Sequence, residues 1–419
     1  MELAHDRFSA ARDEAVELGE RRLLADSLSW LSRASWITGR WQDALPEASA
    51  AVDALEGLAE TPQLARALAR LSQLEMLSGL PRAERRAREA IAVARRVGDV
   101  HAELNARANL AVTLGNRGIP LDTREMRDVL SQAIATGDAL EAYRCLVNSL
   151  WTAQATMTQQ ELDEELDVMR GIMGPLPGVE HLDEYFELSY GLLVDVPAGR
   201  WARPEPLFAR QEALLGVPLY GLRILSRELV GGMAMRRGDL AAAAEPLAAM
   251  REIASAAGEP QRLLPMAAVM TPYAALTGDR EALHELVDTV LSTTDREWAQ
   301  LTTTPVPRAL AAAGETELLE RVATAFRHKA GDLDAPRISI SAMVAEGLLA
   351  LAVGDADSAA TQLLEGAEWE RRLGWVYRAA CIDLDVARAL DAAGKTAEAA
   401  AARDRANAIL EPLGCVNAY

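Results

Sequence analysis

The chain has 419 residues, of which 25% are charged and 50% are hydrophobic, and its formal net charge is −19. Only 5% are aromatic, so Ala and Leu dominate the apolar material, and both residues favour helices over strands. The composition therefore predicts an all-α protein. The negative charge argues against direct binding of DNA or RNA, because phosphate groups carry charge of the same sign.

The cysteines and the N-terminal sequence bear on the cellular location. Cys145, Cys381 and Cys415 are far apart and form no CxxC pair, which fits a reducing compartment and predicts neither a disulfide framework nor a zinc module. The first residues are charged and lack the apolar core of a signal peptide. No run of about 18 uncharged apolar residues predicts a membrane span. We therefore expect a cytoplasmic protein.

Turn-like stretches that begin with glycine recur along the chain. In chain order these glycines are Gly39, Gly79, Gly118, Gly199, Gly238, Gly278, Gly314, Gly354 and Gly394. Thr158 stands where a glycine is missing, and with it the spacings are 40, 39, 40, 41, 39, 40, 36, 40 and 40 residues. A fixed period of this length is typical of repeat architectures.

Each repeat shows the pattern of a helical hairpin. An amphipathic stretch such as Ala25–Thr38 runs into the glycine, which ends the helix in a left-handed conformation. A second amphipathic stretch follows, such as Trp41–Glu56. One hairpin is too small to bury its apolar stripe alone, so neighbouring hairpins must stack. We predict a right-handed superhelical solenoid of about ten hairpins, forming a single unit over residues 1–419.

Small residues recur seven positions before the turn. They are Ser32, Ser72, Ala111, Gly231, Thr271, Gly347 and Ala387. Small side chains at this point are typical of tetratricopeptide packing, although the period here is nearer 40 residues than the usual 34. HEAT repeats have a comparable length without this pattern, and they are the second choice of repeat class.

The segment at 171–218 departs from the repeat. It contains six prolines (Pro175, Pro177, Pro197, Pro204, Pro206 and Pro218) and five aromatic residues (Tyr185, Phe186, Tyr190, Trp201 and Phe208). Prolines interrupt helices, so long loops or a kink in the superhelix are expected here. Two interpretations stay open: a binding site walled by aromatic residues, or a degenerate repeat packed by larger side chains.

Four stretches resemble a known class of proteins: Gly39–Leu45, Ala90–Asp99, Asn105–Ala111 and Ala379–Tyr419. They are similar to the tetratricopeptide-like C-terminal regions of MalT-like and LuxR-type ATP-dependent regulators and of related cyclase-associated signalling ATPases. The resemblance implies a solenoid that receives a small inducer or a partner protein while a neighbouring ATPase reports it.

The ATPase and DNA-binding functions of that class are not expected here. The Gly394-Lys395-Thr396 triplet ends like a phosphate-binding loop, but Ala389 occupies the place of the required upstream glycine. No basic helix-turn-helix follows Ala379–Tyr419. The chain is therefore interpreted either as a fragment of a larger regulator or as a stand-alone solenoid.

No pattern in the sequence indicates catalysis. His284-Glu285-Leu286-Val287-Asp288 begins like the HExxH zinc motif, but Asp288 replaces the second histidine. No nucleophile elbow or dinucleotide-binding glycine motif is present. We expect a non-catalytic binding module that has no metal and no cofactor.

The inner surface of the solenoid is the predicted binding site. If the first helix of each hairpin faces inward as in tetratricopeptide domains, a groove over residues 26 to 152 presents three arginines and three asparagines. They are Arg33, Arg66, Arg70, Asn105, Asn109 and Asn148. Guanidinium groups supply charge and amides supply directed hydrogen bonds, so the groove is predicted to bind an anionic ligand or an acidic peptide.

Two alternatives accompany this hypothesis. The arginines could instead pair with acidic neighbours on adjacent helices, and the asparagines could form structural bonds between repeats. The ligand, whether a small inducer, a peptide or a protein partner, and the oligomeric state stay open. A stand-alone adaptor that joins proteins is the alternative function.

Overall fold

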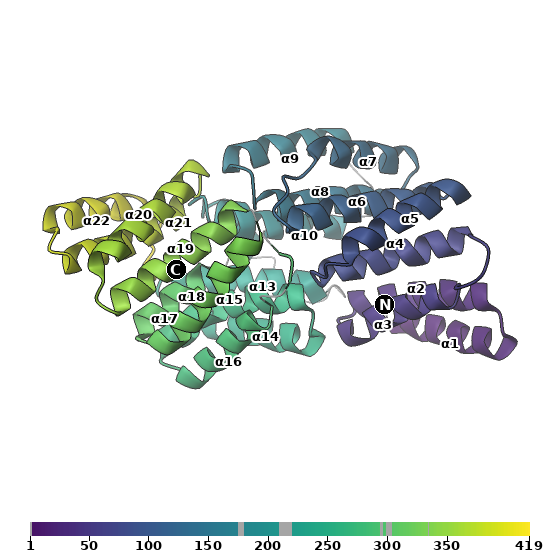
Figure 1. Cartoon of the computed structure of the whole chain (residues 1–419), viewed down its shortest axis with the longest axis horizontal. Coiled ribbons are helices and arrows are strands. Elements are labelled where there is room, and N and C mark those ends of the chain that lie inside the picture. Colours follow the sequence, from purple (N-terminus) through teal and green to yellow (C-terminus); the bar gives the residue numbers. More distant parts are fainter. Residues whose placement is uncertain (1, 175–179, 209–219, 294–295, 299–303, 334) are drawn as a thin grey trace.

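A computed structural model describes residues 2–174, 180–208, 220–293, 296–298, 304–333 and 335–419. The described part of the chain is all-α, with consecutive helices packed as antiparallel hairpins (Figure 1). The predicted fold class, an all-α tandem repeat, is confirmed.

Among the described residues, the helices alternate between the first and second positions of ten repeats, after one additional N-terminal helix, α1 (Glu2–Leu18). The second helix of the fifth repeat is only four residues long. The first helices are α2 (Arg21–Ile37), α4 (Pro62–Leu77), α6 (Val100–Asn116), α8 (Ala139–Ala153), α10 (Glu180–Tyr190), α13 (Tyr220–Arg236), α15 (Pro260–Thr277), α17 (Pro305–Ala313), α19 (Pro336–Ala352) and α21 (Val376–Ala392). The second helices are α3 (Trp41–Asp53), α5 (Ala83–Val97), α7 (Thr123–Ala135), α9 (Gln159–Met173), α11 (Glu205–Phe208), α14 (Leu240–Ala257), α16 (Arg280–Leu291), α18 (Thr316–Asp332), α20 (Ala356–Arg372) and α22 (Thr396–Leu410).

The predicted turns separate the two helices of every hairpin. All nine predicted turn glycines have positive φ, from 62° at Gly79 to 91° at Gly354, a region that side chains with a Cβ rarely occupy. Thr158, the stand-in for the missing glycine, instead caps α9. Its hydroxyl accepts a hydrogen bond from the Glu161 N–H, and the Glu161 carboxylate accepts one from the Thr158 N–H, which together form a capping box.

The small residues before the turns allow the two helices of a hairpin to approach closely. A Cβ added at Gly231 would lie 2.7 Å from Leu247 Cγ, and one at Gly347 would lie 2.8 Å from Leu363 Cγ. These glycines occupy the same position in two repeats, and the leucines occupy the same position on the second helices. The two helices of each of these hairpins can therefore approach this closely only because glycine has no side chain.

The segment at 171–218 carries a distorted repeat. Helix α10 continues into a π-helix, η1 (Gly191–Asp195), before the turn at Gly199. Trp201 is buried and packs edge-on against Tyr377, with 5.1 Å between the ring centroids. This contact fits a degenerate repeat packed by larger side chains. Pro175, Pro177 and Pro218 lie outside the described residues.

The array of hairpins returns on itself, so that helices from distant repeats lie side by side. Trp36 Nε1 donates to Glu259 Oε1 at 3.2 Å, Arg296 Nη1 donates to the Ser78 carbonyl at 3.2 Å, and Arg337 Nε donates to the Gln154 carbonyl at 2.8 Å. These pairs are 183 to 223 residues apart in sequence. In Figure 1, α1–α6 occupy one end of the molecule, α19–α22 occupy the other, and α13–α15 lie between them.

Arg337 shows how tightly these contacts are buried. Its side chain is 1% exposed, lies 4.5 Å from the centroid of the Trp375 ring, and approaches the equally buried Glu370 at 3.8 Å. Trp298 is also buried and packs against the turn at Gly79. A Cβ added at Gly79 would lie 2.8 Å from its indole ring. The return of the chain is thus a packed interface.

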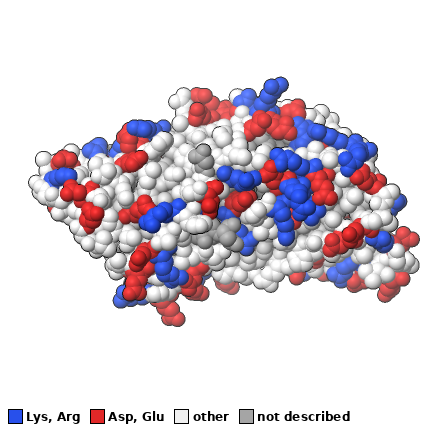
Figure 2. Space-filling view, viewed as in Figure 1, with Lys and Arg blue, Asp and Glu red and all other residues white. Residues whose placement is uncertain are grey.

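Acidic and basic side chains are interspersed over the face shown in Figure 2. No helix among the described residues is both long and apolar enough to cross a membrane.

We expect Gly347→Ala to lower the free energy of unfolding by about 1–3 kcal/mol, because the new methyl group must displace Leu363 from a packed contact. Gly171→Ala is the matched control, since Gly171 also lies inside a helix but has nothing within 4 Å of an added Cβ. There alanine should be neutral or stabilising by up to about 1 kcal/mol. Urea denaturation followed by circular dichroism measures both, and equal effects would contradict the close-packing role.

Candidate functional site

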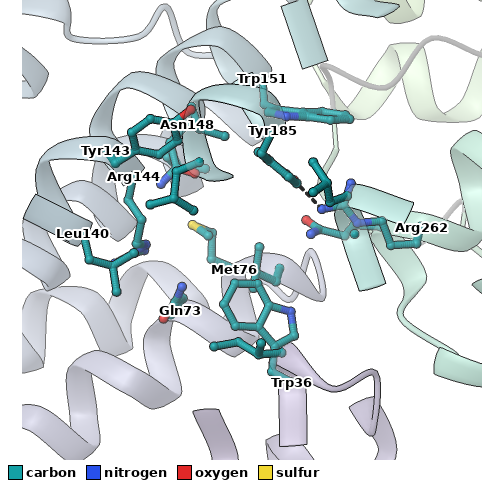
Figure 3. A pocket seen from close by; sticks show the side chains of 18 of the residues that line it. Trp36, Gln73, Met76, Leu140, Tyr143, Arg144, Asn148, Trp151, Tyr185 and Arg262 are labelled. Carbon is teal, nitrogen blue, oxygen red and sulfur yellow. Dashed lines mark hydrogen bonds between the residues drawn. The ribbon is translucent and has the colours of Figure 1, made fainter. Parts of the chain in front are cut away.

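A partly open cavity of about 210 Å³ lies where the distant repeats meet (Figure 3). All of its described lining residues lie on first helices: α2, α4, α6, α8, α10, α13 and α15. We call it the arginine cavity. Its charged lining residues are Arg33, Arg144 and Arg262, and its aromatic ones are Trp36, Tyr143, Trp151, Tyr185 and Tyr220. No Asp or Glu of the described chain lines it.

The repeat positions three of these helices in the same way. Arg33, Gln73 and Val112 each stand six residues before their turn glycine, and all three line the cavity. Trp36 and Met76 follow three residues later in the first two repeats and do the same. The C-terminal halves of α2, α4 and α6 therefore form one wall.

Three guanidinium groups gather on this side of the cavity. Burial and the like charge of Arg144 lower the pKa of Arg33. Burial and the like charges of Arg33 and Arg144 lower the pKa of Arg70 well below its usual value. Arg70 lies behind the wall, donates to Gln73 Oε1 at 2.7 Å and lies 5.2 Å from the centroid of the Trp36 ring. The protein thus concentrates positive charge where water is largely excluded.

The opposite wall is built around Arg262. Its Nη2 donates to the Tyr185 hydroxyl at 2.6 Å, and its guanidinium lies 5.6 Å from the centroid of the Trp151 ring. The Tyr185 contact appears as the dashed line in Figure 3. Glu259, fully buried, lies behind this wall 3.9 Å from Arg262 and accepts the hydrogen bond from Trp36 Nε1. Glu259 thereby connects the two walls.

Several polar atoms at the cavity have no hydrogen-bond partner among the described residues. They include Asn116 Oδ1, Asn148 Nδ2, Thr152 Oγ1 and Tyr220 Oη. A buried polar atom without a partner costs about 1–3 kcal/mol. A ligand or water that bonded to these atoms would recover part of that free energy.

The structure brings four of the six predicted site residues to this region. Arg33 and Asn148 line the cavity. Arg70 lies behind Gln73, as described above. Asn109, fully buried, accepts a hydrogen bond from Arg144 Nη2 at 2.8 Å and donates to the Ala69 carbonyl at 3.0 Å. It supports a lining residue without reaching the cavity itself.

Arg66 and Asn105 do not reach the cavity. Arg66 forms an ion pair with Asp99 at 2.7 Å, and Asn105 Nδ2 donates to Glu141 Oε2 at 2.9 Å. Both contacts join neighbouring repeats. They match the alternative interpretation, in which the arginines pair with acidic neighbours and the asparagines form structural bonds between repeats.

Sequence reasoning missed Arg144, Tyr143, Trp151 and Arg262 as site residues. Arg144 and Arg262 lie near the starts of their helices, whereas Arg33 lies near the end of α2. The C-terminal ends of α2, α4 and α6 line one part of the cavity, and the N-terminal ends of α10, α13 and α15 line another. The lining residues therefore occupy different positions in different repeats. Tyr185 belongs to the aromatic segment that sequence analysis had marked as a possible site.

A second, partly open cavity of about 110 Å³ lies beyond Trp151, which lines both cavities. We call it the mixed-charge cavity, because Glu228 lines it together with Arg236, Arg308 and Arg378. Burial raises the pKa of Glu228 to about 7, although the positive charges of Arg236 and Arg262 oppose the shift. Within the described residues, no group of His, Cys, Asp and Glu is arranged to hold a metal ion.

No protein-family model and no curated protein sequence matches the chain. Among solved structures, a match is found to a circular tandem repeat protein with novel repeat topology and enhanced subunit contact surfaces. The two share 17% sequence identity over 99% of this chain and 96% of that one, with a TM-score of 0.14. A TM-score this low supports no argument about shape or function.

Removing the charge of Arg33 and removing that of Arg144 should change the free energy of unfolding by different amounts. Arg33 forms no hydrogen bond or ion pair with the described residues, so we expect Arg33→Met to leave the free energy of unfolding within about 1 kcal/mol of the parent. Arg144→Met leaves the buried Glu141, 2.7 Å away in the parent, without an opposite charge, although the hydrogen bond from Asn105 remains. A loss of about 3 kcal/mol is expected. Urea denaturation distinguishes the two, and an equal loss would assign Arg33 a structural role.

Glu228 should make stability depend on pH. Its pKa is about 7 in the folded protein against an ordinary 4.5, so the folded state holds the proton more tightly and stability falls as pH rises through that interval. We expect Glu228→Gln to be more stable than the parent by about 1–3 kcal/mol at pH 8 and equal to it near pH 4.5. Glu245→Gln, at an exposed site on α14, is the control. A gain independent of pH would contradict the assignment.

Proposed function

We propose that this protein is a non-catalytic binding module whose arginine cavity takes a small organic anion with a flat apolar body. The observation that carries the proposal is the lining itself. In a chain of net charge −19, three arginines and five aromatic side chains surround a cavity that no described carboxylate lines. The carboxylates nearest to Arg144 and Arg262 belong to Glu141 and Glu259, which do not line it.

The charge of the ligand follows from the arginines. Burial lowers the pKa values of Arg33 and Arg70, and repulsion among Arg33, Arg70 and Arg144 adds to the effect. A carboxylate or similar anion between Arg33 and Arg144 would relieve this repulsion and accept charge-assisted hydrogen bonds. Asn148 Nδ2, without a partner among the described residues, is a further donor for the same group.

The shape of the ligand follows from the aromatic side chains and the volume. Trp36, Tyr143 and Trp151 present flat apolar surfaces, and Met76 fills the space between the helices (Figure 3). Most pockets for drug-sized molecules measure about 300–1,000 Å³, so a cavity of about 210 Å³ favours a smaller molecule. A single aromatic ring or a fused pair with one anionic group fits these limits.

A sensing role follows from where the cavity lies. Its walls belong to α2, α4, α6 and α8 on one side and to α13 and α15 on the other. A ligand that contacts both walls stabilises the closed arrangement of the array relative to any opened one. The resemblance to the solenoids of MalT-like and LuxR-type regulators supports the same role, that of a cytoplasmic module that senses a small inducer.

The alternative is an adaptor that joins proteins. The surface of the N-terminal helices α1 and α2 favours it, because several large apolar side chains are exposed there: Leu3, Val16, Leu18, Leu23 and Trp30. Exposed apolar patches of this kind are typical of protein contacts.

The proposal is tested by titrating the purified protein with benzoate, phenylacetate and indole-3-acetate in an isothermal calorimeter. At least one of them should bind, whereas the neutral amides of the same acids should not. Arg33→Met should weaken binding at least tenfold, about 1.4 kcal/mol, because it removes a charge from the cavity. Arg66→Met is the matched control, since Arg66 lies outside the cavity, and it should bind like the parent.

Native mass spectrometry of the freshly purified protein gives a second readout. A co-purified small anion that is lost in Arg33→Met would support the sensor. If no anion in the set binds, or if Arg66→Met and Arg33→Met behave alike, the arginine cavity is not an anion site and the adaptor becomes the better account.

A further inference from the structure

The mixed-charge cavity differs from the arginine cavity in one decisive respect, because a carboxyl group faces it. Glu228 lies on α13, two helical turns before Arg236 on the same helix. Glu228 forms no hydrogen bond with any described residue, and the charges that act on it most strongly belong to Arg236 and Arg262. A negative and a positive group thus border the same small volume.

Four buried polar atoms at this cavity have no hydrogen-bond partner among the described residues. They are Gln154 Oε1, Trp151 Nε1, Arg236 Nε and Arg378 Nη1. Gln154 is only 1% exposed, so its amide oxygen has little access to bulk water. One of the four atoms is an acceptor and three are donors.

The other polar residues of the cavity are already engaged. Arg308 forms a buried ion pair with Asp385, and its Nη2 donates to the Cys381 carbonyl at 2.7 Å. Tyr377 donates its hydroxyl proton to the Tyr419 carbonyl at 2.7 Å. The groups that remain for a ligand are therefore Glu228 and the four atoms without partners.

We propose that the mixed-charge cavity is a second binding site, for a small zwitterion of the α-amino acid type with an apolar side chain. The ligand's carboxylate accepts hydrogen bonds from Arg236, Arg378 and Trp151. Its ammonium group donates to Glu228 and to Gln154 Oε1.

A ligand with a single charge would satisfy only part of this set. An anion would pair with the arginines but would leave Glu228 and the Gln154 oxygen without donors, and it would be repelled by the Glu228 carboxylate. A cation would pair with Glu228 but would leave the guanidinium donors without an acceptor. Only a molecule that carries both groups complements the whole site.

The apolar walls fit the side chain of such a ligand. Leu192, Val196, Val269 and Ile382 line the cavity with aliphatic surface. Leu192 belongs to the π-helix η1, and π-helical turns inside α-helices occur frequently at functional sites. The volume of about 110 Å³, about half that of the arginine cavity, restricts the ligand to one small molecule.

The test is calorimetric titration of the full chain with L-leucine, L-valine, L-methionine and L-phenylalanine. Two analogues of leucine probe the two charges separately: 4-methylpentanoate lacks the ammonium group, and 3-methylbutylamine lacks the carboxylate. We expect at least one amino acid to bind, and both leucine analogues to bind at least tenfold more weakly than leucine or not at all.

Variants then locate the site. Glu228→Gln and Arg378→Gln should each weaken amino acid binding at least tenfold, with folding checked by circular dichroism. Arg33→Met, which alters only the arginine cavity, should leave amino acid binding unchanged, so failure of the proposed anion site and failure of this one are distinguishable.

Three results would overturn the proposal: no binding of any of the four amino acids to the folded parent protein, equal binding of an analogue that has one charge, or unchanged binding in Glu228→Gln. Because the analogues are tested on the parent protein, the proposal can be refuted even if a variant does not fold.

Discussion

The return of the helical array onto itself is the constraint on which the rest of the structure depends. A row of hairpins that stayed open would expose the inner faces of its first helices to water, and neither cavity would exist. Contacts such as Trp36 with Glu259 and Arg337 with Gln154 close that inner space. They join segments that the repeat pattern places far apart, and they turn a concave surface into an interior where charges are worth more than in water.

Fully buried arginines in this protein have partners that offset the cost of burying their charge. Arg337 lies over the Trp375 ring and bonds to a backbone carbonyl, and Arg308 pairs with Asp385. A guanidinium group is weakly hydrated and stacks on aromatic faces, which makes it the cation best suited to burial. Arg33 stands apart from this pattern, since among the described residues its guanidinium approaches only the Trp30 ring, at 5.9 Å from the centroid. It is only partly buried, and the negative charges of Glu141 and Asp138 partly offset the cost of removing its guanidinium from water.

The sequence predicted the hairpins more fully than the site. Glycine at a left-handed turn and a small residue facing Leu247 or Leu363 are local requirements, so the spacing of Gly39, Gly79 and their equivalents was enough to place them. The cavity depends on which distant repeats meet, and no periodic pattern contains that information. Arg33 and Asn148 were found because they face inward in their own repeats. Arg66 and Asn105 also belong to first helices, but Asp99 and Glu141 of the following repeats engage them.

The two cavities are neighbours, because Trp151 is a wall of both. The Trp151 side chain is only partly buried, its indole nitrogen has no hydrogen-bond partner among the described residues, and the Arg262 guanidinium lies 5.6 Å from its ring centroid. An occupant on either side restricts the indole and lowers the entropy that a second occupant must remove. The charges are linked as well, since Arg262 borders the arginine cavity and acts on Glu228 in the other. If both proposed sites take a ligand, any free-energy coupling between the two ligands is reciprocal.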